Sequence, residues 1–315
     1  MATDLLERLQ LKCVTEADYD KVMAVRQNIY GGHDYLPSCF HTLIKSPNTM
    51  AFAVELDGKF IAFTISFVID DGQTCVERAS RVSEEYEGRG VMKWLQQQVE
   101  VVIMERTSVI YFTISTDISV ERTHRLLQLG KCYPVANRDM SHFTIERSEL
   151  NRVIKNIQLD DVSRYQRLNG ESLEHVLNST ELANHLFGAE RILIHWVPFR
   201  PMKLNISFMI DENTSVIGSN LHIKDAALLT FCYSFEVVHG MKYSIDVYGN
   251  LDHLSTHILL HIQHVKVSKI QDHILVGLFY KGVKEERINQ IMSEIKFSSN
   301  PVGFSGTLSI ERKVR

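Results

Sequence analysis

A short glycine-rich turn lies between a strand pattern and a helix pattern, at Tyr86-Glu87-Gly88-Arg89-Gly90-Val91. The segment before it reads as three strands, over residues 50–56, 59–69 and 74–82. Tight turns at Asp57-Gly58 and Asp70-Asp71-Gly72 separate these strands, so successive strands are expected to be antiparallel. A helix pattern follows the glycines over residues 91–106. Few folds place a glycine turn and a helix directly after three antiparallel strands.

Such a turn is suited to hold an anion. Its backbone N–H groups point into the concavity, and the helix dipole adds positive potential there. Gly88 and Gly90 carry no side chain that would block a ligand. The segment matches neither the longer phosphate-binding loop nor the G-x-G-x-x-G dinucleotide fingerprint. A purely structural turn is the alternative interpretation.

The other elements of the first half alternate in the same regular way. We expect a strand over 10–14, a capping box at Thr15-Glu16-Ala17-Asp18, and a helix from Tyr19 that ends at Gly31-Gly32. A short helix is expected over 37–45. A strand over 109–115, a helix over 120–129 and a hairpin over 133–146 are expected after the long helix. The predicted order is β-α-α-β-β-β-α-β-α-β-β.

The second half repeats part of this order. Residues 150–190 read as helix and linker, and helices are expected over 251–265 and 284–295. Strands are expected over 192–197, 206–210, 227–235, 243–248, 274–280 and 307–310. In this half, the expected elements come in the order strand, Gly249, long helix, strand, helix, strand. The elements expected from residue 74 to residue 146 come in the same order. We interpret the second half as a degenerate duplicate and expect domains over 1–148 and 149–315.

Charge and composition exclude several functions. The net charge of −4 provides no basic field for nucleic acid or an anionic membrane surface. Five cysteines without a C-x-x-C pair indicate neither a disulfide framework nor a zinc site. The sequence shows no apolar run of the ~18 residues that a membrane span needs. We therefore expect a cytoplasmic protein whose partner is a small molecule, with the oligomeric state left open.

Two segments carry a family resemblance. Residues 82–91 resemble the V-x-P-x-x-R-G-x-G-[IV] stretch of the GNAT superfamily of N-acetyltransferases. Residues 29–38, Ile-Tyr-Gly-Gly-His-Asp-Tyr-Leu-Pro-Ser, resemble the I-Y-G-G-x-D-Y-L-P segment of the histidine N-acetyltransferase family, also called the probable N-acetyltransferase sixteen family. Supporting similarities lie at 68–72, 196–201 and 245–249, so the likeness covers residues 12–295.

The resemblance implies a mixed α/β fold, with a GNAT domain followed by a degenerate GNAT-like domain. It also implies transfer of an acetyl group from acetyl-CoA to the α-amino group of a free amino acid, with a histidine-like acceptor and without a metal. Contacts to acetyl-CoA are then expected from Val82, Gly88, Arg89, Gly90, Val91 and Met92.

The sequence departs from the family pattern at chemically important positions. Glu87 replaces an arginine of the loop, and Met92 replaces a small residue. Thr64 and Arg78 stand where the family carries glutamates, and Leu126 stands where a tyrosine often serves as the general acid. These departures leave the base and the acid unassigned. They also keep open a second hypothesis, a non-catalytic paralogue that binds CoA or an amino acid as a sensor or partner protein.

Candidate acceptor residues cluster in the segment before the second helix. Asp34 either anchors a substrate ammonium or caps that helix, and Tyr30 and Tyr35 either line the site or pack. Arg78 and Arg81 are expected to bind an acceptor carboxylate or a CoA phosphate, with paired surface charges as the alternative. The candidates for the catalytic base are Asp34, Glu77 and His33. His253, His257 and His261 recur at helical spacing, as metal ligands would, although a polar helix face explains them as well.

Overall fold

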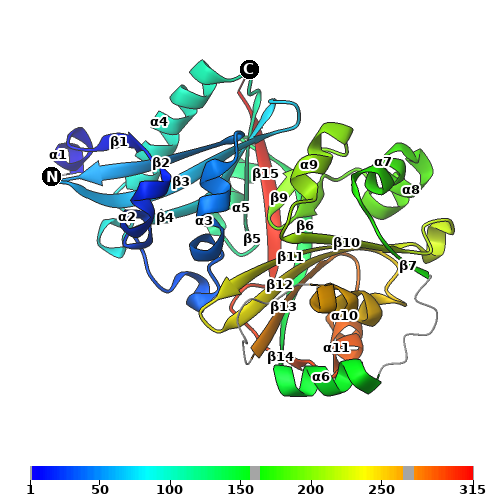
Figure 1. Ribbon diagram of the computed structural model, residues 1–315. Helices are drawn as coiled ribbons and strands as arrows, with labels where there is room; N and C mark the ends of the chain where they lie inside the picture. Colours follow the sequence, from blue (N-terminus) through cyan, green and yellow to red (C-terminus); the bar gives the residue numbers. More distant parts are fainter. Residues whose placement is uncertain (1, 157–163, 265–272, 315) are drawn as a thin grey trace. The chain divides into compact units, whose positions relative to one another are not determined.

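The computed structural model describes residues 2–156, 164–264 and 273–314 (Figure 1). Its contacts divide the chain into two compact units. The first unit comprises Met1–Ser115 with Glu311–Arg315, and the second comprises Thr116–Ile310. The last strand, β15 (Gly306–Lys313), contains one of these boundaries, so each unit includes part of it. Both units combine a sheet with helices, which confirms the mixed α/β class.

The sheet of the first unit follows the expected order of strands. Its strands are β1 (Gln10–Cys13), β2 (Thr49–Leu56), β3 (Lys59–Ile69), β4 (Thr74–Val82) and β5 (Tyr111–Asp117), of which the unit includes residues up to 115. The first four strands are antiparallel neighbours, whereas β4 and β5 are parallel. The turn between β2 and β3 has left-handed φ angles at Asp57 (51°) and Gly58 (79°), as a two-residue type I′ hairpin requires.

Helices cover both faces of this sheet. Successive side chains of a strand point to opposite faces, and here apolar side chains lie on both of them, so each face packs against helices. One face packs against α4 (Val91–Arg106) through Leu95, Val99 and Ile103. The other face packs against α2 (Tyr19–Met23) and α3 (Leu36–Lys45), as Figure 1 shows. A short helix, α1 (Ala2–Glu7), precedes β1. The core beneath α2 and α3 includes Val22, Leu36, Phe40, Phe63 and Ile65.

The segment between α2 and α3 differs from the expectation. The capping box at Thr15 and Asp18 is present, but α2 ends at Met23 rather than at the glycines. The reason is the backbone that follows, because Asn28, Tyr30 and Gly31 have φ angles of 51°, 53° and 63°. A right-handed helix cannot pass through these left-handed conformations. Residues 29–32 therefore form a short 3₁₀ turn, and α3 begins at Leu36.

The second unit contains a larger mixed sheet. Its order begins with residues 306–310 of β15 and continues through β6 (Tyr133–Glu146), β13 (His273–Tyr280), β12 (Gly240–Gly249), β11 (Leu228–Val237), β10 (Thr214–Ser219) and β7 (Tyr165–Arg167). Strands β12 and β13 are parallel, whereas β13 and β6 are antiparallel. The short β14 (Ser298–Ser299) also pairs with β6. A separate hairpin consists of β8 (Ile192–Ile194) and β9 (Val197–Phe199).

The helices of the second unit bury the largest core of the molecule against this sheet. That core contains Leu254, Ile258 and Leu259 of α10, Ile288 and Ile291 of α11, and apolar residues of β6, β12 and β13. The helices are α5 (Glu121–Gln128), α6 (Arg147–Asn156), α7 (Gly170–Asn178), α8 (Thr180–Phe187), α9 (Ile206–Met209), α10 (Leu254–His264) and α11 (Glu285–Glu294). Residue 265, the expected end of α10, lies outside the described residues. Among the described helices, none is long and apolar enough to cross a bilayer.

Two expectations for these segments are wrong. Residues 133–146 form one continuous strand instead of a hairpin, because residues 139–146 pair without interruption with β13. Residues 206–210 form the helix α9 and its C-terminal cap rather than a strand, and the strand β10 was not expected. The repeated order is present, since β12, α10, β13, α11 and β15 follow one another as β4, α4, β5, α5 and β6 do. The domain boundary at 148 and 149 stays a prediction.

Candidate functional site

The glycine turn before α4 is open to a ligand. Gly88 and Gly90 have φ angles of 71° and 84°, and a Cβ atom added at either glycine would meet no atom within 4 Å. Gly90 is the N-cap residue of the 16-residue α4, and no side chain caps that helix end. The first N–H groups of α4, at Val91 and Met92, therefore lack intrahelical partners and are available to an anion.

Glu87 is paired away from this anion site. Its carboxylate forms an ion pair with Arg26, which follows α2. Glu87 stands at a loop position where the family pattern has an arginine, and the positive charge of Arg26 compensates the negative charge of Glu87. Arg89 lies at the turn itself, with its guanidinium carbon 5.5 Å from the ring centroid of Tyr86. The turn is consequently not dominated by the Glu87 charge.

Strands β4 and β5 separate beside the turn. Their parallel pairing runs from Thr74 opposite Tyr111 to Glu77 opposite Ile114, and no further pair is present among the described residues. Strand β4 nevertheless continues to Val82. The edge of β4 that faces β5 is therefore unpaired from Arg78 onward. The Val82 backbone lies at the end of this opening.

A β-bulge decides which side chains of β4 share a face. Ile65 pairs with Arg78 and Phe63 with Arg81, so β4 contains one residue more than β3 over this stretch. Ala79 adopts a φ angle of 54°, which an alanine rarely takes outside such irregular backbone. The extra residue brings Arg78 and Arg81 onto the face covered by α2 and α3. It also places Ser80 on the α4 face, where Glu77 lies.

Asp34 forms a buried ion pair with Arg81. Arg81 Nη1 lies 2.8 Å from Asp34 Oδ2 and Nη2 lies 3.2 Å from Oδ1. Only 3% of the Arg81 side chain and 12% of the Asp34 side chain are exposed. Asp34 Oδ1 also accepts a hydrogen bond at 3.1 Å from the N–H of Leu36, the first residue of α3, although the N-cap residue of that helix is Tyr35. Asp34 thus fastens the 30–35 segment to β4, and its role as an ammonium anchor stays a prediction.

Arg78 occupies a different environment from Arg81. Its guanidinium carbon lies 5.5 Å from the ring centroid of Tyr35 and 5.9 Å from that of Phe67. Among the described residues no carboxylate pairs with Arg78, and its buried Nε has no hydrogen-bond partner. Burial raises the pKa of Tyr35, and the neighbouring Arg78 charge opposes that shift. A partly buried cation between two rings is suited to bind a carboxylate of a ligand.

Glu77 belongs to a hydrogen-bond network on the α4 face. Gln96 Nε2 on α4 donates to both carboxylate oxygens of Glu77 at 2.9 Å. Ser80 Oγ donates to Glu77 Oε1 at 2.6 Å and lies 2.7 Å from the hydroxyl of the buried Thr64. Neither Ser80 nor Gln96 was predicted as a partner of Glu77. In a regular strand Ser80, three positions after Glu77, would face the opposite side of the sheet. Gln96 belongs to α4 and reaches Glu77 only through the packing of that helix. The network holds Glu77 in one orientation beside the opening between β4 and β5.

The remaining candidates lie in the 29–35 segment. His33 is buried, with 8% of its surface exposed, whereas Tyr30 is half exposed. The structure therefore brings Asp34, Tyr35, Arg78 and Arg81 together on one face of β4. It places Glu77 on the other face, and the acetyl-CoA candidates at the end of the strand.

The histidines of α10 form a polar network inside the second unit. Thr230 Oγ1 lies 2.9 Å from His257 Nδ1 and 2.8 Å from His261 Nε2. Burial lowers the pKa of His257 to about 3. His253 Nδ1 lies 3.2 Å from the hydroxyl of Tyr165. Within the described ranges, no group of three or more His, Cys, Asp or Glu side chains is placed to hold a metal ion.

Two family models match the chain in sequence order. Residues 19–130 match the acetyltransferase (GNAT) family, and residues 161–281 match the family described as histidine N-acetyltransferase, C-terminal. The chain contains a GNAT acetyltransferase domain over residues 19–130. The GNAT match includes the open turn, the opening between β4 and β5, and the 29–35 segment.

Curated relatives extend the similarity over most of the chain. The histidine N-acetyltransferase of Scomber australasicus is 25% identical over 290 residues, which cover 86% of this chain and 83% of the relative. That of Oreochromis niloticus is 24% identical over the same coverage. Probable N-acetyltransferase 16 of Homo sapiens is 35% identical over 91 residues, which cover 29% of this chain and 25% of the relative. These similarities place the GNAT protein among enzymes that transfer acetyl groups.

Solved structures confirm that the GNAT fold is followed by a second GNAT-like domain. A tandem GNAT protein from the clavulanic acid biosynthesis pathway aligns with a TM-score of 0.57 and 10% identity, over 97% of this chain and 98% of that chain. A putative acetyltransferase from Pyrococcus horikoshii aligns with a TM-score of 0.53 and 12% identity, over 98% and 90%. At these identities the likeness concerns the fold alone.

Proposed function

We propose that this GNAT protein transfers an acetyl group from acetyl-CoA to the α-amino group of a free amino acid, with histidine as the preferred acceptor. The observation that carries the proposal is the open, uncapped N-terminus of α4 beside the opening between β4 and β5. Anion binding and an unpaired strand edge are the two features that an acetyl-CoA-dependent transferase needs at one place. The names of the curated relatives support histidine as the acceptor.

The residues around the turn fit the cosubstrate. Acetyl-CoA would supply the activated acetyl group. The backbone N–H groups of Gly90 and Val91 would hold its pyrophosphate beside Arg89, whose own N–H donates to the Tyr86 carbonyl at 3.3 Å, and Gly88 leaves room for its approach. The Val82 amide, at the end of the unpaired edge, would polarise the thioester carbonyl. Met92, partly buried in the first turn of α4, would line the same slot.

The acceptor amino acid would bind on the α2 and α3 face. Arg78, which has no ion-pair partner among the described residues, would bind the α-carboxylate. Tyr30, Asp34 and Tyr35 belong to the segment that would close over the acceptor. Because Asp34 is already paired with Arg81, it would position this segment as well as attract the ammonium.

Glu77 is the candidate base that its hydrogen bonds favour, and because its side chain lies on the α4 face, it would act through water in the opening between β4 and β5 on an acceptor bound on the other face. A base must be held in a fixed orientation close to the proton that it removes, directly or through one water molecule. Gln96 and Ser80 hold the Glu77 carboxylate beside the last pair of β4 and β5. Asp34 is committed to Arg81 and His33 is buried, so both are less suited to this role.

A thiol-release assay on a panel of free amino acids tests the proposal. The account expects the fastest release of CoA with L-histidine, and a decrease of about 100-fold or more in kcat for Glu77→Gln. Glu105→Gln, an exposed position near the C-terminal end of α4, is the matched control and should retain wild-type rates. Equal rates for Glu77→Gln and wild type would remove Glu77 as the base. Absence of thiol release with every amino acid would refute the function.

A further inference from the structure

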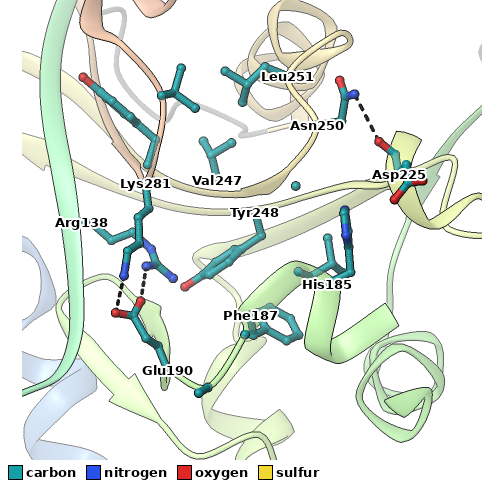
Figure 2. A pocket seen from close by; sticks show the side chains of 16 residues that line it. Arg138, His185, Phe187, Glu190, Asp225, Val247, Tyr248, Asn250, Leu251 and Lys281 are labelled. Atoms are coloured by element: carbon teal, nitrogen blue, oxygen red, sulfur yellow. Dashed lines mark hydrogen bonds and ion pairs between the residues drawn. The ribbon is translucent and has the colours of Figure 1, made fainter. Parts of the chain in front are cut away.

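A separate cavity lies within the second unit, where β12 and β13 end (Figure 2). Its volume is about 540 Å³, within the range of small-molecule sites. The C-terminal end of α8, the ends of β12 and β13, and Arg138 of β6 form its walls. None of the residues discussed for acetyl transfer lines it.

One end of this cavity carries an excess of positive charge. Arg138 Nη1 lies 2.8 Å from Glu190 Oε2, and Lys281 forms an ion pair with the same carboxylate. The Arg138 side chain is only 3% exposed, and its buried Nε has no hydrogen-bond partner among the described residues. Arg138 and Lys281 therefore share the single negative charge of Glu190, and the Arg138 Nε–H donor stays unused. A buried unused donor of this kind is costly unless a ligand satisfies it.

The wall next to the charged end is aromatic and apolar. The Tyr248 ring centroid lies 4.7 Å from the guanidinium carbon of Arg138. The Tyr248 hydroxyl is directed at β8, because it donates to the Leu193 carbonyl at 2.7 Å and accepts from the Leu193 N–H at 2.8 Å. The ring, and not the hydroxyl, is therefore what a ligand meets. Figure 2 shows Phe187 beside it, with His185 and Asp225 on the side of the cavity away from Arg138.

The location corresponds to the opening between β4 and β5 in the first unit. The pairing of β12 and β13 ends at Asp246 opposite Phe279, while β12 continues to Gly249. The loop that follows is nevertheless unlike the glycine turn before α4. The Asn250 N–H donates to the Ala227 carbonyl at 2.8 Å, and the Asp252 N–H donates to Asn250 Oδ1 at 2.8 Å.

The space in front of this loop is also filled. A Cβ atom added at Gly249 would lie 2.2 Å from the Ala227 carbonyl oxygen. Engaged amides and a closed approach leave no cradle for a pyrophosphate. The cavity is therefore not a second acetyl-CoA site, although it occupies the corresponding place in the fold.

We propose that this cavity binds a small organic carboxylate that has no free ammonium group. The carboxylate would lie against Lys281 and the guanidinium edge of Arg138 that lines the cavity, and the body of the ligand would lie along the Tyr248 ring. A zwitterionic amino acid fits poorly, because Glu190, the acid at this end, already pairs with both cations. An N-acetylated amino acid belongs to the favoured class. The choice of an N-acetylated amino acid as the ligand rests on the proposed acetyl transfer. The proposal that the cavity binds a carboxylate does not rest on that function.

Calorimetry on the full chain tests the site. The chain is first saturated with CoA and L-histidine, and N-acetyl-L-histidine is then titrated. We expect one binding event, about tenfold weaker in Lys281→Gln, because a hydrogen bond to a charged group is lost. Lys284→Gln removes the same charge at an exposed position that does not line the cavity, and should bind as wild type does. Arg138→Lys, which keeps the charge but loses the Nε donor, should also bind more weakly.

The outcomes separate this proposal from the proposed function. Absence of a binding event, or an equal Kd for wild type and Lys281→Gln, would overturn the cavity proposal whether or not the chain releases thiol. Two equivalents of bound CoA would overturn it as well, since CoA would then occupy the cavity. A Lys281-dependent event in a chain that releases no thiol would support the site and refute the function. A parallel titration with imidazole-4-acetate shows whether an acylated amino acid or a simple organic acid binds more tightly.

Discussion

Arg78 and Arg81 are three residues apart on β4 and share a face, yet their surroundings assign them different roles. Arg81 is buried and its charge is balanced by Asp34, so it holds the 30–35 segment in place. The Arg78 guanidinium lies near the rings of Tyr35 and Phe67, and its buried Nε has no hydrogen-bond partner within the described part of the chain. A structural arginine is paired within the protein, whereas an arginine that binds a ligand must leave part of its hydrogen-bonding capacity open.

Glutamine at either position should separate these roles. Arg81→Gln leaves the Asp34 carboxylate buried without its cation, so the free energy of unfolding should fall by about 3–5 kcal/mol. Arg78→Gln breaks no ion pair, so stability should change little. Its KM for the acceptor should rise about tenfold, while the Kd of CoA is unchanged. Urea unfolding measures the stability of the two variants, and steady-state kinetics measures their KM for the acceptor. A large loss of stability in Arg78→Gln, or a raised acceptor KM with unchanged stability in Arg81→Gln, would contradict these roles.

Asp246 provides a pH-dependent prediction at the same scale. Burial raises the pKa of this carboxyl to about 7, opposed by the hydrogen bond that the His195 N–H donates at 2.9 Å. Between the ordinary pKa of 3.8 and this value, the folded chain keeps a proton that the unfolded chain has lost. The contribution to stability is therefore present below pH 3.8 and disappears as the pH rises to about 7.

Asp246→Asn cannot titrate and should lack this pH dependence. Between pH 4 and pH 7, the wild type should lose on the order of 4 kcal/mol of unfolding free energy relative to the variant. Urea unfolding midpoints of the wild type and the variant, measured at several pH values, give the difference in unfolding free energy. The other titrating groups are the same in both proteins, so their contributions cancel in this difference. Parallel profiles for the two proteins would show that Asp246 is ionised in the folded state.

The individual residues show where sequence patterns stop being informative. The hydrogen bond from the Leu36 N–H to Asp34 was predictable, because an Asp at a turn commonly accepts a hydrogen bond from the backbone two residues on. Its pairing with Arg81 was not, since it depends on the bulge at Ala79, and an alanine gives no signal for a left-handed backbone. The contacts of Glu77 with Ser80 and Gln96 depend on the same bulge and on the position of α4.

At the scale of elements, the turn before α4 is the feature that must bind phosphate. Gly90→Asp introduces a side chain and a negative charge into the open space in front of the helix, so the affinity for CoA should fall at least 100-fold. Gly58→Asp is a matched control, because Gly58 also has a left-handed φ, of 79°, and open space around it. Calorimetry should show wild-type CoA affinity for the control. Unchanged affinity in Gly90→Asp would refute this placement of the cosubstrate.

The elements that the sequence predicted well carry local signals. The expected and observed bounds of α4 agree at 91 and 106, because a glycine N-cap precedes it and a β-region residue follows it. The segment 133–146 carries no such signal, and only its partner strand β13, more than 120 residues later, makes it one continuous strand. Residues 206–210 are apolar and short, and a short apolar run fits a strand as well as a buried helical turn.

At the scale of the whole molecule, we predict one acetyl-CoA site and not two, despite the duplicated order of elements. The turn before α4 has open glycines, whereas the loop before α10 has engaged amides and a closed approach at Gly249. We therefore expect one equivalent of CoA per chain by calorimetry. Two equivalents would show that the second unit also binds the cosubstrate.

Transfer of a labelled acetyl group tests the central claim most directly. The full chain is incubated with acetyl-CoA labelled with ¹³C in the acetyl group and with L-histidine, and the product is analysed by NMR and mass spectrometry. The account predicts N-acetyl-L-histidine with the label on the α-nitrogen, formed in amounts equal to the CoA released. It also predicts far less product with Glu77→Gln than with Glu105→Gln. Bound CoA without labelled product from any amino acid would contradict the account and identify the chain as a non-catalytic binding protein.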